Sequence, residues 1–219
     1  MLFLAHRGAR RYAAENTLKA FDLALHQGAD GFEFDVRLTR DHQTILCHDS
    51  KLHRLSIRRH TLKKLQAGCD PAEVAPTLGD MLQRYARTAF LNIELKVKGL
   101  EHAVHAALRE FPPERGYFVS SFLPGVVKEL HALDSSLKLG TLSDSPWQLR
   151  RWESLPALYV VPNYRLLSRR LVEEVHDAGR LVCTWTVNQP KKMRRAAELG
   201  VDGIISDDPK LLCETLKNL

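Results

Sequence analysis

Two acidic residues, Glu33 and Asp35, stand two positions apart within a short apolar run. In a β-strand, residues two apart point to the same face, so both carboxylates share one face and Phe34 points to the other. The apolar neighbours predict a strand buried on both faces, where two bare carboxylates would repel each other and lose their hydration. A divalent ion bound through oxygen ligands would neutralise them. An ion pair with Arg7 or Arg37 is the alternative.

A second apolar run carries Glu94 and Lys96 at the same spacing. If this strand follows the first one around a parallel barrel, Glu94 brings a third carboxylate close to Glu33 and Asp35. Lys96 would then hold an anionic group against the metal. The alternative is an ion pair between Glu94 and Lys96 across the barrel, which leaves the convergence of three acids unexplained.

Two histidines lie where predicted strands end, His6 before Arg7 and His48 before Asp49. An imidazole can accept and donate protons near neutral pH, and the Asp49 carboxylate could orient the ring of His48. The guanidinium of Arg7 offers a planar fork for phosphate oxygens. Hydrolysis of a phosphodiester needs one proton taken from the nucleophile, one given to the leaving alkoxide, and a metal that gathers the phosphate oxygens. The two histidines, three acids, arginine and lysine together supply this set.

The elements that must position these residues follow from an alternation of short apolar runs with amphipathic stretches. The runs predict eight strands, at residues 2–6, 31–36, 90–96, 117–121, 137–142, 158–161, 181–187 and 203–206. The stretches between them predict helices at residues 17–27, 78–87, 100–111, 125–133, 147–152, 168–177 and 190–199, with a closing helix from 209. Such an alternation predicts βα units and a parallel sheet. Eight units in 219 residues predict a (β/α)8 TIM barrel near the lower limit of its length, which is roughly 200 residues.

One segment interrupts the alternation. Residues 36–38 and 44–48 flank a turn-like stretch at 39–43, which predicts a hairpin that extends the second strand. Residues 49–77 follow with little regular pattern and many basic side chains. We expect residues 36–77 to form an excursion over the top of the barrel, within a single domain that spans residues 1–219.

Composition limits the class of protein. The chain is 44% hydrophobic and 26% charged, which excludes a disordered chain, a collagen-like repeat and a coiled coil. The 32 basic and 26 acidic residues give a net charge of +6. This surplus suits an anionic partner or serves solubility alone. No nucleic-acid motif accompanies it, so we expect no nucleic-acid partner.

The cellular location is predicted from cysteines and from apolar runs. The four cysteines follow no metal or redox spacing and are expected to be reduced, structural thiols of a cytosolic protein. No secretory signal pattern is present at the N-terminus, and no apolar run approaches the roughly 18 residues of a membrane helix. The sequence therefore predicts a cytoplasmic protein without a membrane anchor, and it indicates no oligomeric state.

Nine segments, in order along the whole chain, carry a resemblance to a known family. They are HRG at 6–8, ENTL at 15–18, GADGFEFDV at 28–36, HD at 48–49, PTL at 76–78, IELK at 93–96, SSF at 120–122, TWTVN at 184–188 and DGIISD at 202–207. On these segments the sequence resembles the glycerophosphodiester phosphodiesterases, and most of all their short bacterial cytosolic members.

The resemblance implies a TIM barrel of the phospholipase-C-like phosphodiesterase type and assigns a role to each candidate residue. It implies one divalent ion, Mg or Ca, at Glu33, Asp35 and Glu94; acid and base roles for His6 and His48; phosphate contacts from Arg7 and Lys96; and a substrate pocket lined by Trp185 and Phe122. Core packing is the alternative for both aromatic residues. We favour His6 as base and His48 as acid, although the reverse assignment fits the sequence too.

The implied reaction is the hydrolysis of small glycerophosphodiesters, such as glycerophosphocholine or glycerophosphoethanolamine, to sn-glycerol 3-phosphate and an alcohol. Two alternatives are a lysophospholipase D that acts on lysophospholipids and a non-catalytic binder of phosphate or nucleic acid. The chain departs from the family at Ala14, where proline is frequent, and in a short, basic segment at residues 52–61. This segment begins a basic cluster that we expect over the mouth of the site, formed by Arg54, Arg58, Arg59, Lys63 and Lys64.

Overall fold

The computed structural model describes residues 1–67, 69 and 73–217. Eight parallel strands form a closed barrel, because β1 pairs with both β2 and β11. The barrel strands are β1 (Leu2–His6), β2 (Gly31–Leu38), β6 (Phe90–Leu95), β7 (Tyr117–Ser121), β8 (Leu139–Ser143), β9 (Tyr159–Pro162), β10 (Leu181–Thr184) and β11 (Gly203–Ser206). The predicted (β/α)8 barrel is confirmed.

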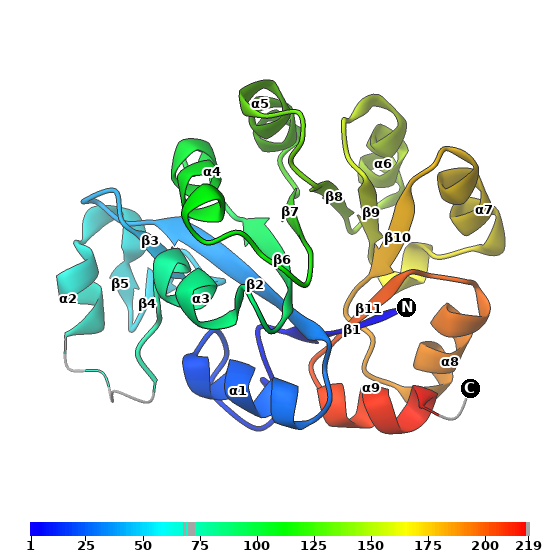
Figure 1. Cartoon of the computed structure of the whole chain (residues 1–219), viewed down its shortest axis with the longest axis horizontal. Coiled ribbons are helices and arrows are strands. Elements are labelled where there is room, and N and C mark those ends of the chain that lie inside the picture. The colour runs from blue at the N-terminus through cyan, green and yellow to red at the C-terminus, as the bar shows by residue number, and fades with distance from the viewer. Residues whose placement is uncertain (68, 70–72, 218–219) are drawn as a thin grey trace.

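The helices surround the ring of strands, as Figure 1 shows. They are α1 (Leu18–His26), α3 (Leu78–Tyr85), α4 (Glu101–Glu110), α5 (Pro124–Leu133), α6 (Pro146–Leu149), α7 (Arg169–Asp177), α8 (Pro190–Glu198) and α9 (Pro209–Leu216). Short polar side chains begin several of them; the Thr17 hydroxyl, for example, accepts a hydrogen bond from the backbone N–H of Ala20. None of the described helices has the length and apolar character to span a membrane.

One predicted helix differs from the structure. Residues 147–152 do not form a single α-helix: α6 ends at Leu149, and the 3₁₀ helix η2 (Arg150–Ser154) continues the chain. A 3₁₀ helix winds more tightly than an α-helix. This winding turns Trp152 into the core, whereas Trp147 stays 67% exposed.

Two apolar layers hold the barrel together. Outside the strands, the ring of Phe21 in α1 packs against Phe32 and Phe34 of β2, with centroid distances of 4.9 and 6.0 Å. Tyr85 of α3 completes this group at 6.0 Å from Phe21 and 5.1 Å from Phe32. Inside the barrel, Phe90, Phe118 and Tyr159 form an aromatic group, in which the rings of Phe118 and Tyr159 stack at 4.1 Å. These rings come from the first two residues of β6, β7 and β9 and fill that end of the barrel. The other end, where the strands finish, holds the polar side chains described below.

The excursion after β2 is confirmed in the described part of residues 36–77; residues 68 and 70–72 of that range lie outside it. Strand β3 (Thr44–Leu46) pairs antiparallel with β2 as predicted. The excursion also contains β4 (Lys51–Leu52), β5 (Leu55–Ser56), the 3₁₀ helix η1 (Ile57–Arg59) and α2 (Leu62–Gln66). A third 3₁₀ helix, η3 (Tyr164–Leu166), follows β9 in the barrel. In Figure 1 these small elements project beyond the ring, on the side of β2 and α3.

Regular structure within residues 49–66 was not predicted, because each strand there pairs over only two residues. Its stability comes from a small apolar cluster of its own, in which the side chains of Ile45, Ile57 and Leu65 are buried. This cluster fixes the excursion to the hairpin of β2 and β3.

Candidate active site

Three carboxylates converge inside the barrel. Glu33 and Asp35 lie on β2, and the neighbouring strand β6 pairs Glu94 with Asp35. One oxygen atom from each residue lies within 4.8 Å of the others, and all three side chains are buried. The predicted convergence is therefore confirmed, and the order of β2 and β6 in the sheet is its cause.

The environment changes the acidity of each carboxyl group. Burial, together with Asp35 and Glu94, raises the pKa of Glu33 well above its ordinary value. Burial and Asp35 raise the pKa of Glu94 to about 7. For Asp35, burial is outweighed by the cations Arg7 and Lys96, which lower its pKa. Without a further cation, three such groups resist simultaneous ionisation.

The donor set fits a divalent cation. Both side-chain oxygens of Glu33 and the Oδ1 atom of Asp35 are buried without a hydrogen-bond donor among the described residues. A buried carboxylate oxygen without a partner is costly, and hard divalent cations prefer such oxygen ligands. The cluster of Glu33, Asp35 and Glu94 can therefore hold a metal ion.

Two basic side chains lie next to the acids, as the ion-pair alternatives in the sequence analysis predicted. The Arg7 Nε atom lies 3.0 Å from Asp35 Oδ2, and the Lys96 Nζ atom lies 2.6 Å from Glu94 Oε1 and 3.4 Å from Asp35 Oδ1. Arg37, the other expected partner, instead donates to the backbone carbonyl of His48. Two cations face three carboxylates, so these ion pairs accompany the cluster without neutralising it.

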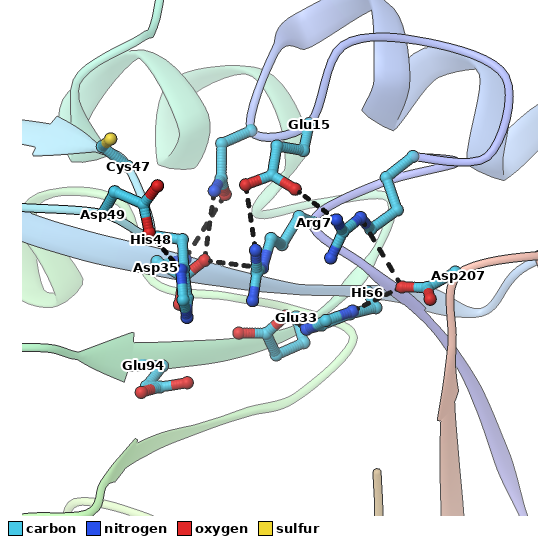
Figure 2. A network of polar contacts seen from close by, with 12 residues as sticks. His6, Arg7, Glu15, Glu33, Asp35, Cys47, His48, Asp49, Glu94 and Asp207 are labelled. Carbon is cyan, nitrogen blue, oxygen red and sulfur yellow. Dashed lines mark hydrogen bonds and ion pairs between the residues drawn. The ribbon is translucent and has the colours of Figure 1, made fainter. Parts of the chain in front are cut away.

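His6 is held by an acid from the opposite end of the chain. Its Nδ1 atom lies 2.6 Å from Asp207 Oδ1, and its Nε2 atom lies 3.7 Å from Glu33 Oε2 (Figure 2). Asn188 donates to the other oxygen of Asp207 at 2.6 Å. Burial lowers the pKa of His6 although Asp207 opposes the change. A neutral ring whose Nδ1–H is bound to Asp207 leaves Nε2 free to accept a proton.

Asp207 was not predicted as a site residue. The available signal was its position directly after the last predicted strand, where barrel side chains reach the active site.

His48 lies on the other side of the acids, at the end of the excursion hairpin. Its Nδ1 atom is 2.9 Å from Asp49 Oδ1, which confirms the predicted orientation of the ring. The His48 side chain is 38% exposed, compared with 11% for His6. The two histidines thus differ in access to solvent.

The loop before α1 adds two residues that the sequence analysis did not place in the site. Asn16 has a left-handed backbone (φ 56°), which asparagine tolerates better than most residues. Its amide nitrogen donates to Asp35 Oδ2 at 3.1 Å. Glu15 bridges Arg7 and Arg10, with one oxygen 2.9 Å from each guanidinium. Asn16 therefore fixes Asp35 in place, and Glu15 fixes Arg7 (Figure 2).

A cavity of about 240 Å³ opens above these groups. It is lined by His6, Arg7, Glu33, His48, Glu94, Lys96, Phe122, Leu142, Asp144, Trp185 and Ile205. Its lining includes eight of the nine candidate residues, and the ninth, Asp35, lies beneath it in the carboxylate cluster. Asp144 is an exposed acid at this cavity that was not predicted.

The two aromatic candidates form one wall of this cavity. The rings of Phe122 and Trp185 meet edge to face, with centroids 5.5 Å apart. The Trp185 indole N–H donates to the carbonyl of Val161 at 3.0 Å, so its polar group is already satisfied. The wall therefore presents aromatic carbon, and Lys96 Nζ lies 5.8 Å from the Phe122 ring centroid.

Comparison with known proteins decides the family. The model of the "Glycerophosphoryl diester phosphodiesterase family" matches residues 6–211. The chain belongs to this family. It is an enzyme of the phosphoric diester hydrolase class, which excludes the alternative of a non-catalytic binder.

Three relatives illustrate the match. A glycerophosphodiester phosphodiesterase from Caldanaerobacter subterraneus subsp. tengcongensis is 34% identical over 241 residues, which cover 100% of this chain and 97% of the relative. A phosphodiesterase structure from Oleispira antarctica, in complex with the product sn-glycerol-3-phosphate, has a TM-score of 0.87 at 26% identity and covers 99% of this chain and 97% of its own. A human lysophospholipase D is 24% identical and covers 98% of this chain and 84% of its own length.

Proposed function

We propose that the enzyme hydrolyses glycerophosphodiesters, such as glycerophosphocholine and glycerophosphoethanolamine, to sn-glycerol 3-phosphate and an alcohol, with Mg or Ca as its cofactor. One observation carries the proposal: three buried carboxylates, two of them with unpaired oxygens, converge between two histidines that are each bound to their own aspartate. The product bound to the Oleispira antarctica relative supports the choice of substrate class.

The residues divide the work of phosphodiester cleavage. When bound, the divalent ion at Glu33, Asp35 and Glu94 would polarise the phosphate oxygens. Arg7 and Lys96, which line the cavity, bind the phosphate and compensate its negative charge.

The two histidines move the protons. His6 accepts the proton of the nucleophile at Nε2, because Asp207 holds Nδ1 and the lowered pKa keeps the ring neutral at pH 7. His48 donates a proton to the leaving alkoxide, and Asp49 holds its Nδ1 atom and so orients the ring. The nucleophile is water or the glycerol 2-hydroxyl, the latter route passing through a cyclic phosphate.

The cavity wall favours an alcohol that carries a positive charge. The Asp144 carboxylate and the aromatic wall of Trp185 and Phe122 line the same cavity. An acid together with aromatic rings attracts an ammonium group by charge and by cation–π contact. Choline and ethanolamine have this chemistry.

A lysophospholipase D is the second candidate. Leu142 and Ile205 extend the aromatic wall with aliphatic carbon, and a human lysophospholipase D is among the relatives. The rate on lysophosphatidylcholine relative to glycerophosphocholine discriminates between the two candidates.

We further propose that residues 1–219 work as a single domain in the cytoplasm, without a nucleic-acid partner. Free, buried thiols at Cys47, Cys183 and Cys213 support a reducing compartment.

The test measures release of sn-glycerol 3-phosphate from glycerophosphocholine by the purified protein. Activity is expected with Mg or Ca and is lost in EDTA, in Glu33→Gln and in His48→Ala. Glu101→Gln, at a buried glutamate outside the site, is the matched control and should retain activity. Full activity in EDTA, or an unaffected Glu33→Gln variant, would refute the metal-dependent reaction.

A further inference from the structure

A second, larger cavity lies beside the active site and takes no part in the proposed reaction. It has a volume of about 710 Å³ and lies between the hairpin of β2 and β3, the 3₁₀ helix η1 and the chain after β6. Its polar lining includes Arg37, Arg40, Arg58, Lys98, Ser50 and Ser56, and we call it the cationic groove.

The charges of the cationic groove are of one sign. Arg40, Arg58 and Lys98 are exposed, and Arg37 is half-buried. No acidic residue lines the groove, and no ion pair joins its four basic side chains to a carboxylate in the described part of the chain. The carboxylate of nearby Asp41 is occupied elsewhere, since it accepts hydrogen bonds from the Thr39 hydroxyl and the Leu62 N–H. Four gathered cations without counter-charges form an attractive site for an anion.

The cationic groove adjoins the active-site cavity through two chain segments. Lys98 follows Lys96, which lines the active-site cavity, by two residues. Arg37 donates to the backbone carbonyl of His48, whose side chain lines that cavity. Two residues of extended chain span at most about 7 Å. A ligand of modest length can therefore reach both cavities.

We propose that the cationic groove binds a second phosphate group, distinct from the diester cleaved in the barrel. The forks of Arg40 and Arg58 match pairs of phosphate oxygens, and Arg37 and Lys98 add positive charge. The hydroxyls of Ser50 and Ser56 can donate hydrogen bonds to a phosphate. The phosphate has two possible sources. In the first, the second phosphate belongs to the substrate, as a phosphate monoester on the alcohol part of the diester. In the second, it is a free phosphate ion that changes the activity of the enzyme. Only the first source rests on the proposed function.

The first arm of the experiment compares two substrates, glycerophosphoglycerol and the same diester with a terminal phosphate monoester. If the substrate carries the second phosphate, the wild-type KM is lower for the phosphorylated diester. The double variant Arg40→Gln/Arg58→Gln then raises that KM about ten-fold, since each exposed charge pair contributes up to about 1 kcal/mol. The KM and kcat for the unphosphorylated diester stay unchanged. Arg59→Gln/Lys64→Gln removes the same charge from exposed positions outside the groove lining, and should leave both KM values as in the wild type.

The second arm measures binding of inorganic phosphate by calorimetry and needs no hydrolysis. The wild type and the control double variant should show two sites, and Arg40→Gln/Arg58→Gln should show one. Two sites with no preference between the two diesters would identify free phosphate as the ligand. A single site in all three proteins, together with equal KM values for both diesters, would overturn the proposal. If the wild type binds phosphate at two sites but hydrolyses neither diester, the proposed function is refuted, while phosphate binding by the cationic groove is still supported.

Discussion

Without a divalent ion at Glu33, Asp35 and Glu94, the stability of this protein should fall as the pH rises. In the ion-free site, burial and Asp35 raise the pKa of Glu94 to about 7, from 4.5 in the unfolded chain. A raised carboxyl pKa means that stability is fully present below pH 4.5 and is lost as the pH rises through 7. We therefore expect EDTA-treated protein to be less stable at pH 8 than at pH 5.

The magnitude follows from the two pKa values of Glu94. Each pKa unit of difference corresponds to about 1.4 kcal/mol, so its ionisation inside the barrel costs about 3 kcal/mol by pH 8. For a protein of this length, 1 kcal/mol changes Tm by about 2–4 °C. Because the unfolded chain is already partly ionised at pH 5, the difference between the two pH values is about 2.5 kcal/mol. The EDTA-treated protein should therefore melt roughly 5–10 °C lower at pH 8 than at pH 5 from this group alone.

The assay is thermal unfolding followed by circular dichroism at both pH values, with EDTA or with Mg or Ca. At pH 8 a divalent ion at 100 times its Kd should restore about 2.7 kcal/mol to the wild type. Glu94→Gln cannot ionise, so the part of the pH dependence that comes from Glu94 disappears, while Glu33, whose pKa is also raised, keeps its own part. The ion should raise the Tm of this variant much less than that of the wild type. Glu101→Gln alters a buried glutamate elsewhere and should keep both responses.

Two results would contradict this reasoning. An equal Tm at pH 5 and pH 8 for the EDTA-treated wild type would show that Glu94 ionises without cost. An ion response that is as large in Glu94→Gln as in the wild type would place the ion away from the three carboxylates.

Three further substitutions test other parts of the structure. Asp207→Asn removes a charge that raises the pKa of His6, so the acidic limb of the pH–rate profile should move to lower pH and kcat should fall about ten- to a hundred-fold. Trp185→Ala should raise the KM for glycerophosphocholine about ten-fold with a smaller change in kcat, because a cation–π contact is lost. Gly31→Ala would place its Cβ 1.8 Å from the Phe90 carbonyl oxygen, so thermal unfolding should show a loss of more than about 4 kcal/mol.

Local periodicity explains what the sequence could predict. The two-residue period of a strand places Glu33 and Asp35 on one face, and the same rule applies to Glu94 and Lys96. Their convergence needed one more assumption, that β6 lies next to β2, and the parallel alternation of strands and helices made this order the expected one. The convergence of these side chains could therefore be predicted from the sequence.

Contacts between distant segments explain what the sequence could not predict. Asp207 is 201 positions from His6, and no local pattern joins an acid after the last strand to a histidine at the end of the first strand. The cationic groove likewise takes Arg37, Arg58 and Lys98 from three separate segments. Short pairings such as β4 with β5 span too few residues to produce a periodic signal.

Closure of the barrel through β1 also affects how the protein is made. Strand β1 pairs with β2, but its other neighbour is β11, which leaves the ribosome last among the strands. Until then the free edges of β1 and β10 are open to pairing with other chains. Since His6 needs Asp207, directly after β11, the site is assembled only after that step. The first appearance of activity during cell-free synthesis should therefore mark the moment at which the ring of strands closes.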